Sequence, residues 1–230
     1  MRINREGHRI ILISGLFFLL CWVAAFYLFV NHRTTVLFSG FSAFILFLWL
    51  YIITFFREPK RVLINDPTLV FSPCDGRVVA IEKVGVYEYL HCEMMQISVF
   101  MSLTNIHMNW FPVGGNIEYV KYHPGRFLMA WLPKSSKDNE HTTTVVRTEH
   151  NHIIMFRQIA GFIARRIVTY AKPGLRAIQN KPLGFIKFGS RMDVFVPLDY
   201  IVYVELGDRV IGNQTPLAKV NSGSPNNYNL

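Results

Sequence analysis

Two long apolar runs open the chain and differ from the shorter runs that follow. Residues 10–30 and 34–56 contain no Asp, Glu, Lys or Arg. At about 1.5 Å per helical residue, each run can cross the roughly 30 Å hydrocarbon core of a bilayer. Because only a short connection separates them, the pattern predicts two antiparallel membrane helices joined as a hairpin. One span with an interfacial helix is the alternative, whereas a signal peptide has a shorter apolar core and no second span.

Basic residues flank this hairpin at its outer ends: Arg2, Arg5, Arg9, Arg57, Lys60 and Arg61. Between the two runs lies Arg33, next to His32. The cytoplasmic flanks of membrane helices carry the excess of Lys and Arg. The pattern therefore predicts that both ends of the hairpin, and the rest of the chain with them, lie on the cytoplasmic side of a cell membrane.

After Arg61 the pattern changes to short runs of β-branched and aromatic residues separated by turn residues. Examples are "GRVVAIEKV", "MMQISVFM", "TTTVVRT", "MDVFVP" and "YIVYVEL". Such runs are typical of strands, and no long amphipathic helix interrupts them. Three parts are predicted: a membrane anchor at residues 1–61, a mainly β soluble domain at residues 62–220, and a disordered polar tail at residues 221–230.

Two of these segments resemble strands of the barrel-sandwich found in biotinyl and lipoyl carriers, Ser72–Glu82 and Val204–Val220. They raise the alternative of a membrane-anchored, non-catalytic carrier or adaptor. A carrier needs its modified lysine at the tip of a tight hairpin. The nearest candidate is Lys187, but "GFIKFG" has no hairpin-turn pair around it.

The composition of the chain limits the kinds of binding partner that are expected. The chain is 51% hydrophobic and carries a formal net charge of +9. An excess of Lys and Arg suits a surface beside anionic lipid headgroups. Nucleic acid is the usual alternative for a basic protein, but no binding motif supports it and no nucleic-acid partner is expected. Cys21, Cys74 and Cys92 form no C-x-x-C pair, so neither a disulfide framework nor a zinc site is predicted.

One glycine–serine pair, Gly189–Ser190, stands within a set of motifs. The pair alone is an ordinary turn dipeptide. Five motifs occur in order: "FFREPKR" (Phe55–Arg61), "SPCDGRV" (Ser72–Val78), "NIHMNWFPVGG" (Asn105–Gly115), "RQIAGFIARRIV" (Arg157–Val168) and "GFIKFGSRMDV" (Gly184–Val194). Together they closely resemble the short form of the phosphatidylserine decarboxylase family, over about Phe55 to Val220.

The resemblance implies a proenzyme that cleaves itself between Gly189 and Ser190. The products would be a β chain, residues 1–189, and an α chain, residues 190–230, which stay associated. Residue chemistry agrees, because Ser190 Oγ can attack the Gly189 carbonyl and glycine tolerates the strained backbone and close approach this needs. Elimination of the resulting ester leaves dehydroalanine, which hydrolyses to a covalent pyruvoyl group, the bound form of pyruvate.

The implied reaction converts phosphatidylserine to phosphatidylethanolamine at a membrane. The pyruvoyl ketone would form a Schiff base with the serine headgroup, and the protonated imine would accept electrons as CO2 leaves. No metal and no diffusible cofactor are implied. Related serine-headgroup lipids with ether-linked chains fit the same motifs. A non-catalytic adaptor, by contrast, would have no reason to break at Gly189.

The resemblance also implies two acid–base residues, Asp75 and His107. Asp75 lies in "SPCDG", where the family's aspartate is thought to polarise a histidine during self-cleavage, although Asp-Gly is also a common hairpin turn. His107 follows a strand-like run, and an unperturbed pKa of about 6.5 suits acid or base catalysis. The longer decarboxylases carry a second histidine three residues later, where this chain has Trp110. His107 is therefore expected to serve at least one of the two reactions.

Other candidates carry less specific signals. The guanidinium of Arg191 suits a substrate carboxylate or phosphate, but it can equally pair with Asp193. His123 is a candidate for the headgroup pocket. His150 and His152 would share a face if they lay on a strand, but Asn151 between them suggests a turn and no third metal ligand is evident.

Overall fold

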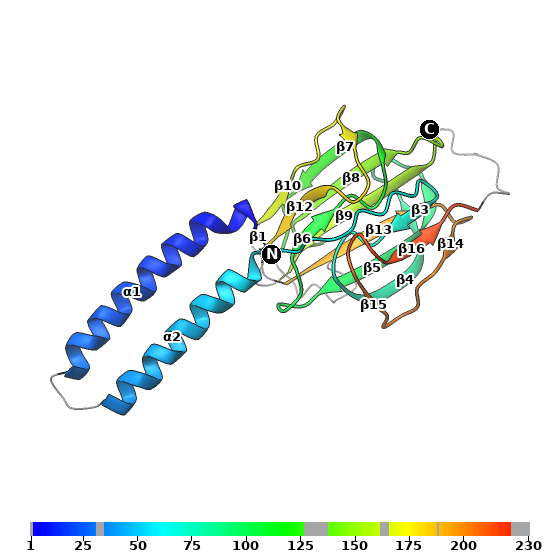
Figure 1. The fold of residues 1–230 in the computed structure, drawn as a ribbon. Helices are drawn as coiled ribbons and strands as arrows, with labels where there is room; N and C mark the ends of the chain where they lie inside the picture. Colours follow the sequence, from blue (N-terminus) through cyan, green and yellow to red (C-terminus); the bar gives the residue numbers. More distant parts are fainter. Residues whose placement is uncertain (1, 31–34, 127–137, 162–165, 188, 222–230) are drawn as a thin grey trace. The chain divides into compact units, whose positions relative to one another are not determined.

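The computed structural model describes residues 2–30, 35–126, 138–161, 166–187 and 189–221 (Figure 1). The chain forms two compact units, Met1–Lys60 and Arg61–Leu230. The connection between the apolar runs, at residues 31–34, lies outside the described residues. So does the predicted disordered tail, apart from Asn221.

The first unit is an antiparallel pair of helices, α1 (His8–Val30) and α2 (Thr35–Phe55). Both are long and apolar enough to cross a membrane. The indole of Trp22 in α1 donates a hydrogen bond to Ser42 in α2 at 2.9 Å, and the indole of Trp49 in α2 reaches the Ile11 carbonyl in α1 at 3.3 Å. A one-turn 3-10 helix (Arg5–Gly7) precedes α1, and strand β1 (Arg2–Ile3) pairs with β2 (Arg57–Glu58). The predicted apolar helices are confirmed.

The second unit is built around an eight-stranded antiparallel sheet that curls into a half-barrel (Figure 1). Its strands, in spatial order, are β11 (Arg176–Ala177), β7 (Gly115–His123), β8 (His141–Arg147), β9 (Ile153–Ala160), β13 (Ser190–Val196), β5 (Cys92–Met101), β4 (Gly76–Val86) and β15 (Arg209–Val210). Strands make up nearly all of the regular structure among the described residues of this unit. The prediction of a mainly β domain is confirmed.

Two three-stranded sheets complete the β domain. One has the order β10 (Ile167–Thr169), β12 (Pro182–Ile186) and β6 (Met108–Trp110), and the other β14 (Ile201–Val202), β16 (Pro216–Lys219) and β3 (Leu69–Phe71). The two carrier-like segments lie side by side, because Arg209 pairs with Arg77 and Val210 with Gly76. Segments far apart in sequence are thus joined in one barrel-like unit.

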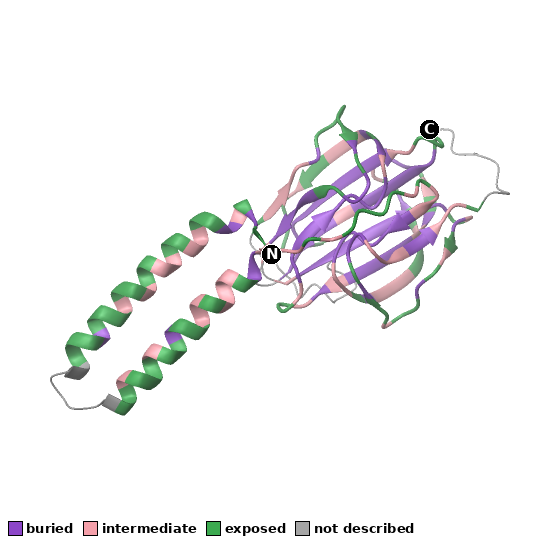
Figure 2. Cartoon of the chain, viewed as in Figure 1, coloured by how far each residue is buried: buried purple, intermediate pink, exposed green. Residues whose placement is uncertain are grey.

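The central strand of the large sheet, β13, lies in the middle of the domain, where Figure 2 shows mostly buried residues. All seven residues of β13 are buried. Its even-numbered side chains, such as Met192 and Val194, join the main core with Val99 of β5. Phe195 belongs to a second core on the other face with Met155. Polar side chains on this strand therefore need partners inside the protein.

Candidate active site

The Gly189–Ser190 bond lies where β13 begins, at one end of the large sheet. Ser190 pairs with Met101 of β5 and Ala160 of β9, and its side chain is fully buried. Gly189 has φ of +69°, in the left-handed region that strongly favours glycine. The predicted cleavage point therefore combines a buried hydroxyl with a backbone conformation that a side chain would strain.

His107 contacts Gly189 from the loop before β6. Its Nε2 accepts a hydrogen bond from the backbone N–H of Gly189 at 3.1 Å. Its Nδ1 lies 3.0 Å from the Asn105 carbonyl, so Nδ1 carries the proton and Nε2 keeps its lone pair. The imidazole is fully buried. Residues 82 positions apart in sequence are thus fixed in contact, with the histidine in the tautomer that a base requires.

A backbone donor faces the Gly189 carbonyl, and sequence reasoning missed it. The N–H of Gly161 donates to the Gly189 oxygen at 3.1 Å. Asn139 and Glu140 hold the preceding residue: the Asn139 side chain donates to the Ala160 carbonyl at 2.7 Å, and the Glu140 carbonyl accepts from the Ala160 N–H at 2.9 Å. The residue type does not reveal which backbone N–H groups act as donors. The position of Gly161 in the "RQIAGF" motif was therefore the one available clue to this donor.

The Ser190 hydroxyl has a weak acceptor. Its Oγ lies 3.1 Å from the sulfur of Met101, which also accepts from the Asn109 side-chain amide at 3.7 Å. The side-chain oxygen of Asn109 in turn accepts from the side-chain amide of Gln158 at 2.9 Å. A thioether is a poor acceptor. Because this hydrogen bond is weak, the hydroxyl can break it at little energetic cost and rotate toward the carbonyl carbon of Gly189.

Asp75 makes its hydrogen bonds away from His107. Its Oδ2 pairs with Arg61 at 2.6 Å, and its Oδ1 accepts from the Gly212 N–H at 2.8 Å. The Arg61 guanidinium lies over the ring of Trp110, 4.7 Å from its centroid. The residue that stands in place of the second histidine therefore helps to hold the Asp75–Arg61 pair. A part for Asp75 in self-cleavage stays a prediction.

The Asp75–Arg61 pair predicts a thermodynamic coupling. Both side chains are mostly buried, with 15% and 11% exposed, so either one left alone is poorly solvated. We expect Asp75→Asn and Arg61→Gln each to destabilise the β domain by roughly 1–3 kcal/mol. The double variant should lose less than the sum of the two, which thermal unfolding in detergent will measure.

Additive losses would contradict this coupling. The rate of self-cleavage, followed in the same variants, separates the two roles of Asp75. A direct role in catalysis slows only Asp75→Asn, whereas a positioning role slows both single variants.

Arg191 points to the face of the sheet opposite Ser190. Its Nε donates to Asp193 at 2.6 Å and its Nη2 to Ser98 at 2.6 Å. Both Arg191 and Asp193 are almost completely buried. The structure thus shows the pairing with Asp193 that the sequence allowed, and substrate binding by Arg191 stays a prediction.

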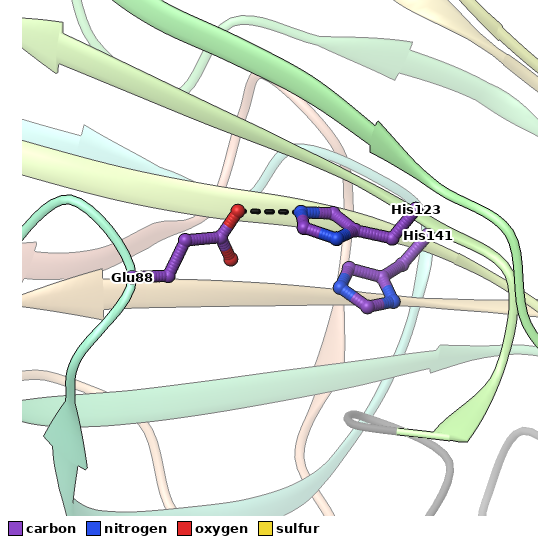
Figure 3. Close-up of side chains that lie close together, drawn as sticks. All are labelled: Glu88, His123 and His141. Atoms are coloured by element: carbon purple, nitrogen blue, oxygen red, sulfur yellow. Dashed lines mark hydrogen bonds and ion pairs between the residues drawn. The ribbon is translucent and has the colours of Figure 1, made fainter.

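His123 lies far from the cleavage point in the sheet. Strands β8 and β9 separate its strand, β7, from β13, so three strand spacings of about 4.8 Å place it roughly 14 Å away. Its Nε2 is 2.5 Å from Glu88, and its ring stacks on His141 with centroids 4.4 Å apart (Figure 3). The structure does not bring His123 together with Ser190.

Glu88, His123 and His141 are the one group within the described ranges whose ligand atoms lie close enough to hold a metal ion. Two features make this group a charge network instead. Glu88 Oε2 already accepts from Arg157 at 2.8 Å and from Thr143 at 2.9 Å. The two rings are nearly parallel, at 14°, so their in-plane lone pairs do not converge on one point.

The network predicts a loss of stability at mildly acidic pH. Burial lowers the pKa of His141 below its ordinary 6.5, although its Nδ1 bond to the Asn139 carbonyl opposes this. The unfolded chain then binds more protons than the folded one, so stability present above about pH 6.5 declines as the pH falls. Hydrogen bonds from His123 and Thr143 lower the pKa of Glu88 despite its burial, which extends the decline in the same direction below about pH 4.5.

We therefore expect the unfolding temperature to be lower at about pH 5.5 than at about pH 7.5. Over this range the free energy of unfolding should decrease by up to roughly 1.4 kcal/mol per pH unit. His141→Gln should remove part of that dependence. Identical pH profiles for the parent and His141→Gln would show that His141 does not contribute.

His150 and His152 belong to the turn between β8 and β9. Asn151 between them has φ of +60°, and the N–H of Thr148 donates to the His152 carbonyl at 2.8 Å. The His152 ring is buried against Tyr200. The two histidines thus do not share a strand face.

The fold and the site first define a class. A mainly β domain follows two membrane-capable helices, and in it a histidine and a backbone N–H both contact the glycine of a glycine–serine pair, as expected of a self-processing proenzyme. The family model of phosphatidylserine decarboxylase matches residues 48–218. The chain belongs to the phosphatidylserine decarboxylase family.

Curated relatives agree over nearly the whole chain. The phosphatidylserine decarboxylase proenzyme of Phocaeicola vulgatus is 43% identical over 221 residues, 96% of each chain. That of Amoebophilus asiaticus is 45% identical over 223 residues, 96% of this chain and 98% of the relative. That of Porphyromonas gingivalis is 48% identical over 177 residues, 76% and 80% of the two chains. The family makes this chain a decarboxylase, a lyase formed as a zymogen, and its two apolar helices are compatible with membrane association.

Proposed function

We propose that this protein decarboxylates phosphatidylserine to phosphatidylethanolamine, using a pyruvoyl group that it makes from its own Ser190. The observation that carries the proposal is the arrangement at Gly189, whose N–H bonds to His107 Nε2 and whose carbonyl accepts from Gly161. In a member of this family, that arrangement supports self-processing at the Gly189–Ser190 bond.

Processing begins with Ser190 Oγ, which adds to the carbonyl carbon of Gly189. The Gly161 N–H already bonds to the oxygen on which negative charge develops. The C–N bond between the two residues then breaks as an ester forms, and the freed nitrogen takes up a proton. Loss of the Ser190 α-proton expels the Gly189 carboxylate and leaves dehydroalanine. Water hydrolyses this to the pyruvoyl with release of ammonia.

His107 is the residue placed to move protons in these steps. Its Nε2 is unprotonated and lies 3.1 Å from the nitrogen of Gly189, next to the scissile bond. Once formed, the pyruvoyl supplies an electron sink, because a Schiff base between its ketone and the substrate amine lets the carboxylate leave as CO2. His107 is then available to return a proton to the product.

We place the reaction at the cytoplasmic face of a cell membrane. The hairpin would anchor the β domain, and the α and β chains would stay together because β13 of the α chain is paired with β5 and β9 of the β chain. Protease added to intact spheroplasts should leave the β domain whole. Digestion of the β domain by the external protease would contradict the cytoplasmic placement and put this domain on the other side of the membrane.

The test is an assay on purified protein with vesicles that contain phosphatidylserine. We expect phosphatidylethanolamine and CO2 to form, and reduction with cyanoborohydride during turnover to attach the lipid to the small chain. Cleaved protein that forms no phosphatidylethanolamine would contradict the assignment of substrate. Ether-linked phosphatidylserine, tested beside the diacyl lipid, identifies the alternative substrate, and an uncleaved protein would favour the adaptor.

A further inference from the structure

Two buried side-chain amides lie beside position 190, and none of the self-processing steps uses them. They belong to Asn109 in β6 and Gln158 in β9, and both side chains are almost completely buried. Gln158 lies opposite Met192 of β13, two positions from Ser190, so alternation along the strands puts Gln158 and Ser190 on one face of the sheet. Buried amides need hydrogen-bond partners inside the protein or in a ligand.

The hydrogen bonds between these amides fix which way each one points. Gln158 Nε2 lies 2.9 Å from Asn109 Oδ1 and 3.4 Å from the Val168 carbonyl. A carbonyl oxygen can only accept, so Gln158 turns its NH2 group toward Val168 and Asn109 offers its oxygen to Gln158. The NH2 group of Asn109 is thereby directed to the other side, where the sulfur of Met101 lies at 3.7 Å.

This NH2 group is a good donor that has a poor acceptor. The sulfur of Met101 is its one acceptor among the described residues, and a thioether accepts hydrogen bonds weakly. Gln158 Oε1 is also buried, and it has no partner in the part of the chain that the structure describes. Buried polar groups without good partners cost stability, and sequences keep such groups mainly at functional sites. The arrangement therefore indicates a ligand with hydrogen-bonding groups of its own.

The same sulfur connects Asn109 with position 190. Met101 Sδ lies 3.1 Å from Ser190 Oγ, so this hydroxyl and the Asn109 amide contact one atom. His107, two positions before Asn109, accepts from the N–H of Gly189 at 3.1 Å. One short segment thus reaches both residues of the processing site. In the proposed processing Oγ leaves with Gly189, so an oxygen of the substrate can take its place beside the sulfur.

We infer that the NH2 group of Asn109 binds the carboxylate of the serine headgroup, and that Gln158 is the positioning residue that holds this amide in its orientation. The inference rests on the proposed function, in which the substrate amine forms a Schiff base at position 190. The carboxylate is attached to the carbon beside that nitrogen, so it lies next to position 190 as well. A neutral amide suits this ion, because a cation would stabilise the carboxylate more before its charge is lost than in the transition state.

Kinetics with vesicles of phosphatidylserine in phosphatidylcholine test the inference. Asn109→Leu, Gln158→Leu and the double variant are compared with the parent, and each rate is divided by the amount of small chain present. Asn109→Leu and the double variant should raise KM for phosphatidylserine roughly 10- to 100-fold, the usual contribution of a hydrogen bond to a charged group. Gln158→Leu should raise it less. The double variant leaves neither amide without its partner, so it should fold even if a single variant does not.

Product inhibition provides a measurement that a merely structural role would not reproduce. Phosphatidylethanolamine has an amine like that of the substrate but no carboxylate, so its inhibition constant should stay near that of the parent in every variant. Gln96→Leu is the matched control. Gln96 is also a buried amide and donates to Ser98 at 2.9 Å, but it pairs with Phe195 on the opposite face of the sheet. This variant should change neither constant.

Trapping with cyanoborohydride separates the inference from the reaction. The protein is incubated with equal amounts of phosphatidylserine and phosphatidylethanolamine that carry different acyl chains, so each adduct on the small chain reveals its source. The parent should trap more phosphatidylserine, and the double variant should lose this preference. If no protein releases CO2 but the preference is lost, the proposed function fails and the carboxylate site stands.

Three results would overturn the inference. The first is an unchanged KM, or a preference that the double variant keeps. The second is an inhibition constant for phosphatidylethanolamine that rises together with KM, because the amides would then only maintain the shape of the site. The third is failure of all three variants to release the small chain, because the amides would then serve self-processing.

Discussion

Ser190→Ala is expected to remain a single chain of 26.6 kDa and to have no decarboxylase activity above background. The substitution removes the oxygen that would attack the Gly189 carbonyl and the Cβ–O bond whose loss would give dehydroalanine. It removes one hydroxyl from a fully buried position whose acceptor is only a thioether, so the fold should persist. Denaturing electrophoresis and the vesicle assay measure the two results.

Ser224→Ala provides the matched control, since Gly223–Ser224 is the chain's other glycine–serine pair. That variant should cleave at Gly189 and turn over like the parent. Cleavage of Ser190→Ala at Gly189, or equal loss of activity in both variants, would contradict the role of Ser190.

His107→Ala is expected to slow at least one reaction by roughly 10²–10⁴-fold, the usual effect of removing a general acid or base. The imidazole contacts Gly189 directly, and its tautomer is fixed by the Asn105 carbonyl. Two rates locate the step: the appearance of the small chain after synthesis, and turnover of whatever processed enzyme accumulates. Slow cleavage with normal turnover assigns His107 to processing, and the reverse assigns it to decarboxylation.

Loss of a buried ring also lowers stability, so the control is a second buried histidine. His152 packs against Tyr200 in the turn before β9, away from the cleavage point. His152→Ala should lower the unfolding temperature but leave both rates near those of the parent. If His107→Ala cleaves and turns over normally, His107 has neither role.

The sequence was sufficient for the hairpin because its signal is local. Runs without charge at residues 10–30 and 34–56 became helices His8–Val30 and Thr35–Phe55. Strands were likewise predictable from short apolar runs, as in "GRVVAIEKV", which forms most of β4. Their order in the sheet was not, because β13 lies between β9 and β5 through pairings that no local pattern encodes.

In the candidate site, too, some features could be predicted from the sequence and others could not. Motif order connected His107 with Ser190, although 82 residues separate His107 from Gly189. The donor at Gly161 could not be predicted, since any residue other than proline offers a backbone N–H. Nor could the partner of Asp75, because Arg61 reaches it only once the chain has folded.

The network around Glu88 could not be predicted from the sequence either. Glu88 lies in the β4–β5 loop, and its carboxylate bonds to His123 and Arg157 from β7 and β9. The sequence made His123 a candidate for the headgroup pocket, and that role stays a prediction, but its pairing with Glu88 could not be foreseen. Long-range charge pairs of this kind depend on register, which a single sequence does not specify.

The most direct test of self-processing is the intact mass of the purified wild-type protein. We predict two chains, residues 1–189 and 190–230, with the smaller one lighter by one ammonia than a peptide that begins with serine and resistant to N-terminal sequencing. A single species of 26.6 kDa from correctly folded protein in membranes would contradict the account, as would a small chain with a free serine at its N-terminus.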